Sequence, residues 1–400
     1  MKKECYIVDA IRTPIGSFGG AFSSIDAIEL AAVTVRKLAE RFSNKKENKH
    51  LLKDNVDEFI LGNVIATCLG QAPARQVVMK SSFPSNVRGM TVNKVCGSGM
   101  EAIRLGANAI YLCEADSLIC GGTESMSNYP YVLKGGRFGW RMGHSQVLDL
   151  ILADALTDPY SQKHMGQITS ALAEKYKITK EEQDKYAIES YKRSLAAIKE
   201  DLFKDEIAPV EVKQKKQLIT IENDEEPGKG NIDKLPNLRA IFGKEGGITA
   251  GNASSINDGA ATCLLMSEDK VKKMEVKPRA KILGFSSYSG DPDLFAITPI
   301  HGIKMLWDKL GMKKEDFDLY EINEAFSASS LIILKELGLD QEKVNVNGGA
   351  VALGHPIGAS GARIIVTLLN SLEKRNLKRG IASLCIGSGE ALSIAIELVN

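Results

Sequence analysis

His355 stands in a stretch whose residue types suit an active-site loop. It is one of five histidines in the chain and lies between Gly354 and Pro356. Proline biases the residue before it away from the helical region, and glycine permits turns that residues with a Cβ resist. We therefore expect the imidazole on a loop that leads into a helix over residues 360–373, whose small first residues leave N–H groups accessible. The other interpretation is a tight strand-to-helix turn with an incidental histidine.

Three further side chains of chemical interest lie at comparable junctions. Cys96 precedes a Gly-Ser-Gly turn and the start of a helix, where N–H groups and the helix dipole favour a thiolate and hence a nucleophile. Asn323 and Cys385 each end an apolar, strand-like run. Each residue also has a structural interpretation, because either cysteine could be a packing residue and Asn323 could cap a helix.

Alternating strand and helix patterns organise the first part of the chain. Apolar runs bounded by turn residues predict strands, and apolar residues at helical spacing predict helices. In order, the expected elements are a strand over 6–8 that runs into a turn over 10–16, a helix over 26–41, a strand over 55–63, a strand and turn over 91–99, a helix over 100–111 and a strand over 117–122. Strand, helix and strand in this order favour a right-handed parallel crossover.

The pattern changes between residues 125 and 256. Long charged helices, such as 179–200, and polar loops, such as 222–234, replace strands there, and a strand pattern returns at 258–266. We interpret the region as an insertion. The predicted units are an N-terminal α/β half, 1–124 completed by 257–277, an inserted loop domain, 125–256, and a C-terminal α/β half, 278–400.

The C-terminal half repeats the N-terminal half. Residues 317–323 match 57–63, 346–347 match 92–93, and 383–387 match 117–121, at an offset of about 250 to 265 residues. Three matches in one order at that long period indicate a duplicated domain. The predicted fold class is therefore α/β with two similar halves, whose strand ends meet at one cleft. In this match Cys385 corresponds to Cys120, which we expect to be a core residue.

Composition argues against several classes of protein. The 44% hydrophobic content and 25% charge suit a globular protein. A net charge of +1 gives no global field for nucleic acid or an anionic membrane, and no uncharged run is long enough to span a bilayer. Seven cysteines in 400 residues do not form the pattern of a disulfide framework. With no signal-peptide pattern, we expect a cytoplasmic protein that has no nucleic-acid or membrane partner.

Six motifs occur in one order along almost the whole chain. They are Thr-Val-Asn-Lys-Val-Cys-Gly-Ser-Gly (91–99), Gly-Gly-Thr-Glu-Ser-Met-Ser (121–127), Thr-Ala-Gly-Asn-Ala-Ser (249–254) with Asn-Asp-Gly-Ala-Ala (257–261), Asn-Glu-Ala-Phe (323–326), the stretch that contains His355 (346–363) and Leu-Cys-Ile-Gly (384–387). Together they resemble the thiolase family, specifically its acetyl-CoA acetyltransferases. The resemblance implies a thiolase fold with αβαβα layers, an insertion that covers the active site, a homotetramer, and neither a metal nor a dissociable cofactor.

The resemblance also implies a role for each candidate catalytic residue. Cys96 attacks acetyl-CoA and becomes acetylated, His355 assists its activation, and Cys385 moves a proton at the α-carbon of a second acetyl-CoA. One oxyanion hole consists of His355 and a water on Asn323, and the other of the N–H groups of Cys96 and Gly387. The implied reaction is the reversible condensation of two acetyl-CoA molecules to acetoacetyl-CoA and CoA.

The resemblance places coenzyme A against the insertion. Ser254 is expected to contact the pantetheine arm, Phe242 its apolar part, and Lys229 or Arg239 the phosphates, although most lysines in such a loop are simply solvated. His164-Met165-Gly166 is similar to the loop beside the acyl pocket of short-chain members, although Met165 could equally fill a core. Phe326 is a further expected substrate contact.

Three alternatives stay open: a degradative 3-ketoacyl-CoA thiolase of broader chain length, a ketosynthase, which lacks a second catalytic cysteine, and a non-catalytic scaffold that binds acyl-CoA. The chain also departs from the family pattern. The departures are Ser255, Ser388, Glu390-Ala391, the stretch 289–300, and a missing arginine near Pro227, whose part Lys229 could take.

Overall fold

A computed structural model gives the fold and describes residues 3–44, 51–214, 217–243 and 246–399. Its main element is a ten-stranded sheet with the order β12-β13-β14-β11-β1-β10-β5-β3-β4, in which β2 also pairs with β10. The strands are β1 (Cys5–Arg12), β2 (Gly16–Ser17), β3 (Glu58–Gly62), β4 (Arg88–Val92), β5 (Ser117–Ser125), β10 (Asn257–Ser267), β11 (Ala280–Ser289), β12 (Leu319–Ile322), β13 (Arg379–Ile386) and β14 (Glu390–Leu398).

The sheet consists of two similar halves that meet at β1 and β11. In the N-terminal half β3 is parallel to β4 and β5, while β10 is antiparallel to β5 and β1. In the C-terminal half β12 is parallel to β13, while β14 is antiparallel to β13 and β11. The halves join through the pairs Tyr6 with Lys281 and Ile7 with Ala280. This topology contains the predicted parallel crossover and the predicted duplication.

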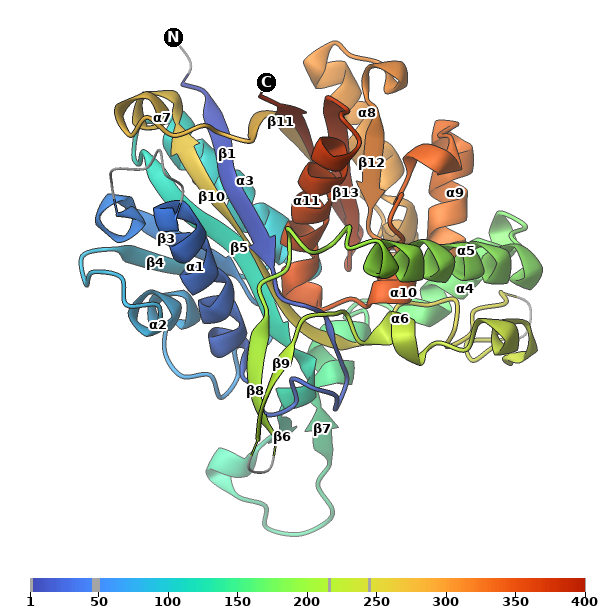
Figure 1. Ribbon diagram of the computed structural model, residues 1–400. Helices are drawn as coiled ribbons and strands as arrows, with labels where there is room; N and C mark the ends of the chain where they lie inside the picture. The colour runs from blue at the N-terminus through green and yellow to red at the C-terminus, as the bar shows by residue number, and fades with distance from the viewer. Residues whose placement is uncertain (1–2, 45–50, 215–216, 244–245, 400) are drawn as a thin grey trace.

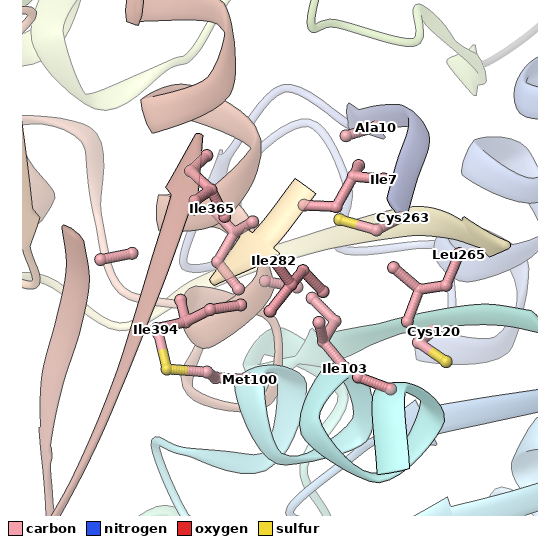
Figure 2. Close-up of a cluster of buried hydrophobic side chains, with 14 of the residues drawn as sticks. Ile7, Ala10, Met100, Ile103, Cys120, Cys263, Leu265, Ile282, Ile365 and Ile394 are labelled. Carbon is pink, nitrogen blue, oxygen red and sulfur yellow. The ribbon is translucent and has the colours of Figure 1, made fainter. Parts of the chain in front are cut away.

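Helices complete five layers, as Figure 1 shows. The outer helices are α1 (Ala27–Asn44) and α2 (Pro73–Lys80) on the N-terminal half, and α8 (Pro299–Leu310) and α9 (Ser327–Leu337) on the C-terminal half. Between the halves lie α3 (Ser98–Tyr111) and α11 (Ile357–Lys374), whose apolar side chains form one core with strands of both halves. Figure 2 shows Ile103 of α3 and Ile365 of α11 in this core, beside Ile282 and Ile394. The predicted αβαβα layering is confirmed.

The region between β5 and β10 adds no further layer. It contains α4 (Met165–Lys175), α5 (Lys180–Lys199), α6 (Glu226–Lys229) and two hairpins, β6 (Tyr131–Leu133) with β7 (Val147–Asp149) and β8 (Val210–Gln214) with β9 (Gln217–Ile221). A capping box between Thr179 and Glu182 sets the start of α5, close to the predicted boundary. The polar loop predicted over 222–234 instead includes α6, because Pro227 suits the first turn of a helix.

Two short helices, α7 (Glu268–Lys273) and α10 (Ala350–Leu353), follow β10 and precede α11, respectively. The predicted unit boundaries, 1–124 with 257–277, 125–256 and 278–400, remain an interpretation of this arrangement. Residues 1–2, 45–50, 215–216, 244–245 and 400 of these units lie outside the described residues.

The register of the two halves corrects the sequence match of the cysteines. Strand β3 pairs Gly62 with Gly122 of β5, and β12 pairs Ile322 with Ser383 of β13. Gly62 and Ile322 occupy equivalent positions, because each directly precedes a matched asparagine, Asn63 or Asn323. Gly122 and Ser383 are therefore equivalent too. Two residues further along each strand, Glu124 of β5 is the counterpart of Cys385 of β13. The match with Cys120 was wrong, since small apolar residues repeat along both strands and do not define a register.

Candidate functional site

One cavity collects residues of both halves and of the insertion. It has a volume of about 340 Å³, and Cys96, His355, Cys385 and Gly387 contribute to its lining. Cys96 lies between β4 and α3, His355 lies just before α11, and Cys385 lies near the end of β13. The structure thus brings together three of the four residues predicted to share a cleft, and the fourth, Asn323, lies beside His355 without being part of the lining.

Cys96 follows a strained turn, and its side chain is protonated. Val95 has a φ of 47°, which is unfavourable for a β-branched residue. Ser98 Oγ holds this turn by accepting from the Lys94 N–H at 2.8 Å and donating to the Val95 carbonyl at 2.6 Å. Burial raises the pKa of Cys96 to about 11, and the N–H groups of Gly387 and of Cys96 itself only partly offset this. The helix start favours a thiolate at Cys96, but burial favours the protonated thiol, so a nucleophilic Cys96 needs a base.

His355 lines the same cavity as Cys96 and is the candidate for that base. Its Nδ1 lies 2.5 Å from Ser360 Oγ, which donates its hydrogen to the Pro356 carbonyl at 2.9 Å. With its one hydrogen on the Pro356 carbonyl, Oγ is free to accept from Nδ1–H, an arrangement that leaves Nε2 a free lone pair. Burial, with a smaller contribution from Arg363, lowers the pKa of His355 to about 3, so the ring is neutral near pH 7. Sequence reasoning missed this hydroxyl, although it lies in the same glycine-rich stretch.

Asn323 and Cys385 come from the ends of neighbouring strands. Asn323 Nδ2 lies 3.5 Å from His355 Nε2, while its backbone N–H donates to the Ser383 carbonyl at 2.9 Å. Cys385 is almost fully buried, and burial raises its pKa, with the nearby Cys96 adding to the effect. The cavity therefore holds two protonated thiols beside one neutral imidazole.

Two residues whose importance the sequence did not reveal anchor the His355 loop. Asn257 Oδ1 accepts from the His355 N–H at 2.9 Å and from Ser255 Oγ at 2.8 Å. Glu124, which is fully buried, accepts from the Gly358 N–H in the first turn of α11 at 2.9 Å. Both belong to motifs noted in the sequence, but only the folded chain shows what their side chains hold.

Five residues predicted to contact substrate line the same cavity. They are His164, Met165, Phe242, Ser254 and Phe326. The rings of His164 and Phe242 stack with centroids 4.6 Å apart, and Ser254 Oγ donates to the Ala325 carbonyl at 3.0 Å. The insertion therefore contributes an apolar wall with a few fixed polar atoms, as small-molecule sites commonly have.

The two predicted phosphate ligands lie elsewhere. Lys229 and Arg239 are exposed and are not part of the cavity lining. Lys229 Nζ lies 3.2 Å from a carboxylate oxygen of Glu225, so its charge already has a partner. Phosphate binding by either cation stays a prediction.

Among the residues with described positions, no three His, Cys, Asp or Glu side chains are grouped so that they could hold a metal ion. In the same part of the chain, every helix is too short or too polar to cross a bilayer.

Two family patterns together span most of the chain. The thiolase N-terminal domain matches residues 5–269, and the thiolase C-terminal domain matches residues 276–398. The chain belongs to the thiolase family. An acetyl-CoA acetyltransferase of Pseudomonas aeruginosa is 45% identical over 396 residues, which are 98% of this chain and 99% of that protein. Solved thiolase structures are also similar to this chain over nearly its whole length.

The crystal structure of the Bacillus anthracis acetyl-CoA acetyltransferase has a TM-score of 0.94 at 41% identity, over 100% of this chain and 99% of that one. The human mitochondrial 3-ketoacyl-CoA thiolase has a TM-score of 0.94 at 37% identity, over 99% of both chains. The thiolase fold is therefore established over the full length of the chain.

This thiolase departs from the family pattern in its last motif. Ser388 replaces a glycine but has a φ of 71°, so the backbone keeps a conformation that glycine favours. Glu390 forms an ion pair with Lys94, two residues before Cys96. The substitution thus adds a contact between the loops that carry the two cysteines. A third departure, Ser255, adds the hydrogen bond to Asn257 described above.

Proposed function

We propose that this thiolase is an acetyl-CoA C-acetyltransferase, which condenses two molecules of acetyl-CoA reversibly to acetoacetyl-CoA and CoA. Relatives named acetyl-CoA acetyltransferase are 43% to 46% identical over nearly the whole chain. The observation that carries the proposal is the common cavity of Cys96, His355 and Cys385. The reaction needs a nucleophile, a base that activates it and a group that moves a proton at carbon, and these three residues can supply all of them.

The first half-reaction transfers an acetyl group to sulfur. His355 Nε2 takes the proton of Cys96, and the thiolate attacks the carbonyl carbon of acetyl-CoA. The resulting oxyanion accepts hydrogen bonds from the N–H groups of Cys96 and Gly387, which already point at the Cys96 sulfur. The bond to CoA then breaks, the CoA thiolate takes the proton of Cys385, and CoA leaves. Acetyl-Cys96, a Cys385 thiolate and a His355 imidazolium remain.

The second half-reaction forms the carbon–carbon bond. The Cys385 thiolate removes a proton from the α-carbon of a second acetyl-CoA. The resulting enolate oxygen is stabilised by His355 Nε2–H on the side where the Asn323 amide lies. The enolate carbon attacks the carbonyl of acetyl-Cys96, and the bond to sulfur breaks. Cys96 recovers its proton from His355, so all three groups return to their starting forms. No dissociable cofactor takes part in the proposed cycle.

Acetylation of the resting enzyme tests the proposal. After mixing with acetyl-CoA, the intact mass should increase by one acetyl group, and peptide mapping should place it on Cys96. The Cys96→Ala variant should gain none. If the folded wild-type chain gains no acetyl group, it is an acyl-CoA-binding scaffold and the proposed function is wrong.

Chain length separates the proposal from a broader 3-ketoacyl-CoA thiolase. Met165 lies in the wall of the cavity that both reacting cysteines line. We expect acetoacetyl-CoA to be cleaved with a kcat/KM at least about 10² times that for 3-ketohexadecanoyl-CoA, which corresponds to about 3 kcal/mol of differential transition-state binding. Comparable values for the two substrates would favour the broader enzyme.

The proposal includes a homotetramer in the cytoplasm. The β6–β7 hairpin extends from the body of the molecule (Figure 1) and exposes large apolar side chains, among them Phe138 and Met142, which are 92% and 91% exposed. Such surfaces commonly mark contacts with another chain. All seven cysteines are free thiols, which suits a reducing compartment.

A further inference from the structure

A buried cation lies directly behind the catalytic side chains. Arg363 projects from α11 and is 3% exposed. Its Nη2 lies 3.4 Å from Asn323 Oδ1, and its Nη1 lies 3.6 Å from an oxygen of Glu321, which is itself buried on β12. The cation therefore lies between a carboxyl group on one side and the amide that contacts His355 on the other.

The guanidinium fixes which way the Asn323 amide faces. A guanidinium group has only donors, so the amide oxygen must face Arg363 and the amide NH₂ must face His355 Nε2, 3.5 Å away. An NH₂ group can approach Nε2 only if that nitrogen carries a lone pair. The contact therefore selects the Nδ1–H tautomer of His355.

The other side of the imidazole selects the same tautomer independently. Ser360 gives its hydrogen to the Pro356 carbonyl and so must accept from Nδ1–H. Two neighbours on opposite sides of one ring thus agree on where the proton resides. The charge of Arg363 also disfavours a second proton on the ring, which keeps the base in its free form until Cys96 gives up its proton.

We propose that Arg363, held by Glu321, is a positioning residue that fixes the amide of Asn323 and thereby holds Nε2 of His355 as the free lone pair that receives the Cys96 proton. This inference rests on the proposed acetyl transfer to Cys96. It assigns a task to a buried arginine that is not part of the cavity lining.

The test compares two arginines that each donate to an asparagine oxygen. Arg363→Met removes the contact with Asn323, whereas the control Arg375→Met removes a charge that also acts on Glu321 but whose hydrogen bond goes to Asn347 Oδ1 at 2.8 Å. The acetylation rate of Cys96 is followed by intact mass at several pH values. We expect Arg363→Met to lower this rate about 10²-fold, the scale of a lost general base, with the KM for acetyl-CoA within about twofold of wild type. Arg375→Met should acetylate at the wild-type rate.

A spectroscopic measurement reads the tautomer without turnover. ¹⁵N NMR of the resting enzyme, with labelled histidine and His355→Gln to assign the signal, should show protonated Nδ1 and unprotonated Nε2. Arg363→Lys keeps the positive charge but loses the planar guanidinium group. It should acetylate faster than Arg363→Met and more slowly than wild type. In Arg363→Met, the Nδ1–H signature should weaken in favour of a tautomer mixture.

Two results would overturn the inference. One is an Nε2–H signature in the wild-type resting enzyme, which stays decisive even if Arg363→Met fails to fold. The other is a folded Arg363→Met variant that acetylates as fast as Arg375→Met. Failure of the proposed function looks different, because the wild-type chain itself then gains no acetyl group.

Discussion

Cys96 is partly exposed and Cys385 is buried, and the two sulfurs also differ in the donors that surround them. Cys96 receives N–H groups from Gly387 and from its own backbone, whereas Cys385 has only its own N–H to offset burial. Donors aimed at the first sulfur also stabilise an oxyanion that forms beside it. This asymmetry supports the proposed roles, acyl transfer for Cys96 and proton transfer for Cys385.

Substitutions at the cysteines test this division. Cys385→Ala should still acquire an acetyl group from acetyl-CoA, because CoA can leave as a thiolate, but it should neither condense nor cleave. Cys120→Ala is the matched control, since Cys120 lies in the core between α3 and the sheet, as Figure 2 shows. It should keep full activity and lose about 1 kcal/mol of stability. If Cys385→Ala remains folded but gains no acetyl group, the two sulfurs act as a unit and the assigned roles are wrong.

The element that unites the site is α11, whose first turn follows His355. Glu124 of β5 meets this turn at Gly358, and it also accepts from the N–H groups of Val64 and Ile65 at 2.9 and 3.3 Å. Burial raises the pKa of Glu124 to about 7 despite these donors. One carboxyl group therefore joins the N-terminal half to the helix that carries the catalytic loop, and its protonation is linked to folding.

The pH dependence of stability tests this link. Because the pKa of Glu124 rises from 4.5 in the unfolded chain to about 7 in the fold, the folded state binds more protons between these values. Its contribution to stability is complete below about pH 4.5 and is lost as the pH rises through about 7. The melting temperature of wild type minus that of Glu124→Gln should therefore fall between about pH 5 and about pH 8. The exposed Glu114→Gln serves as control, and a pH-independent difference for Glu124→Gln would contradict the link.

At the scale of the whole molecule, the β6–β7 hairpin exposes large apolar side chains that nothing within a single chain covers among the described residues. The loop of this hairpin extends beyond the sheet (Figure 1), and its side chains Phe138 and Met142 are almost fully exposed, so these two add nothing to the core. A second pair of chains that covers them would remove this surface from water. This is the physical basis of the proposed tetramer.

Light scattering after size exclusion tests the assembly. A double variant, Phe138→Ser with Met142→Ser, should shift the mass from four chains of 43.4 kDa to two, because the apolar contact is lost. Leu218→Ser alters an exposed leucine of the other hairpin, 64% exposed, and should leave the mass unchanged. A tetramer that persists in the double variant would show that the hairpin is not the contact.

The sequence by itself determined the layered α/β fold, the duplication, and the identity of Cys96, Asn323, His355 and Cys385 as residues of one cleft. Turn chemistry and strand patterns are local, and two similar halves must place equivalent strand ends together. Sequence reasoning could not determine the register that makes Glu124 the counterpart of Cys385, because residues that alternate in and out of a sheet fit several alignments.

Only the tertiary structure decided the protonation of the site. The local pattern around Cys96 predicted a thiolate, yet burial among groups distant in sequence makes it a thiol. The tautomer of His355 depends on Ser360 at one nitrogen and on Asn323, held by Arg363, at the other. A pKa is set by desolvation and by charges nearby in space, and a linear sequence records neither.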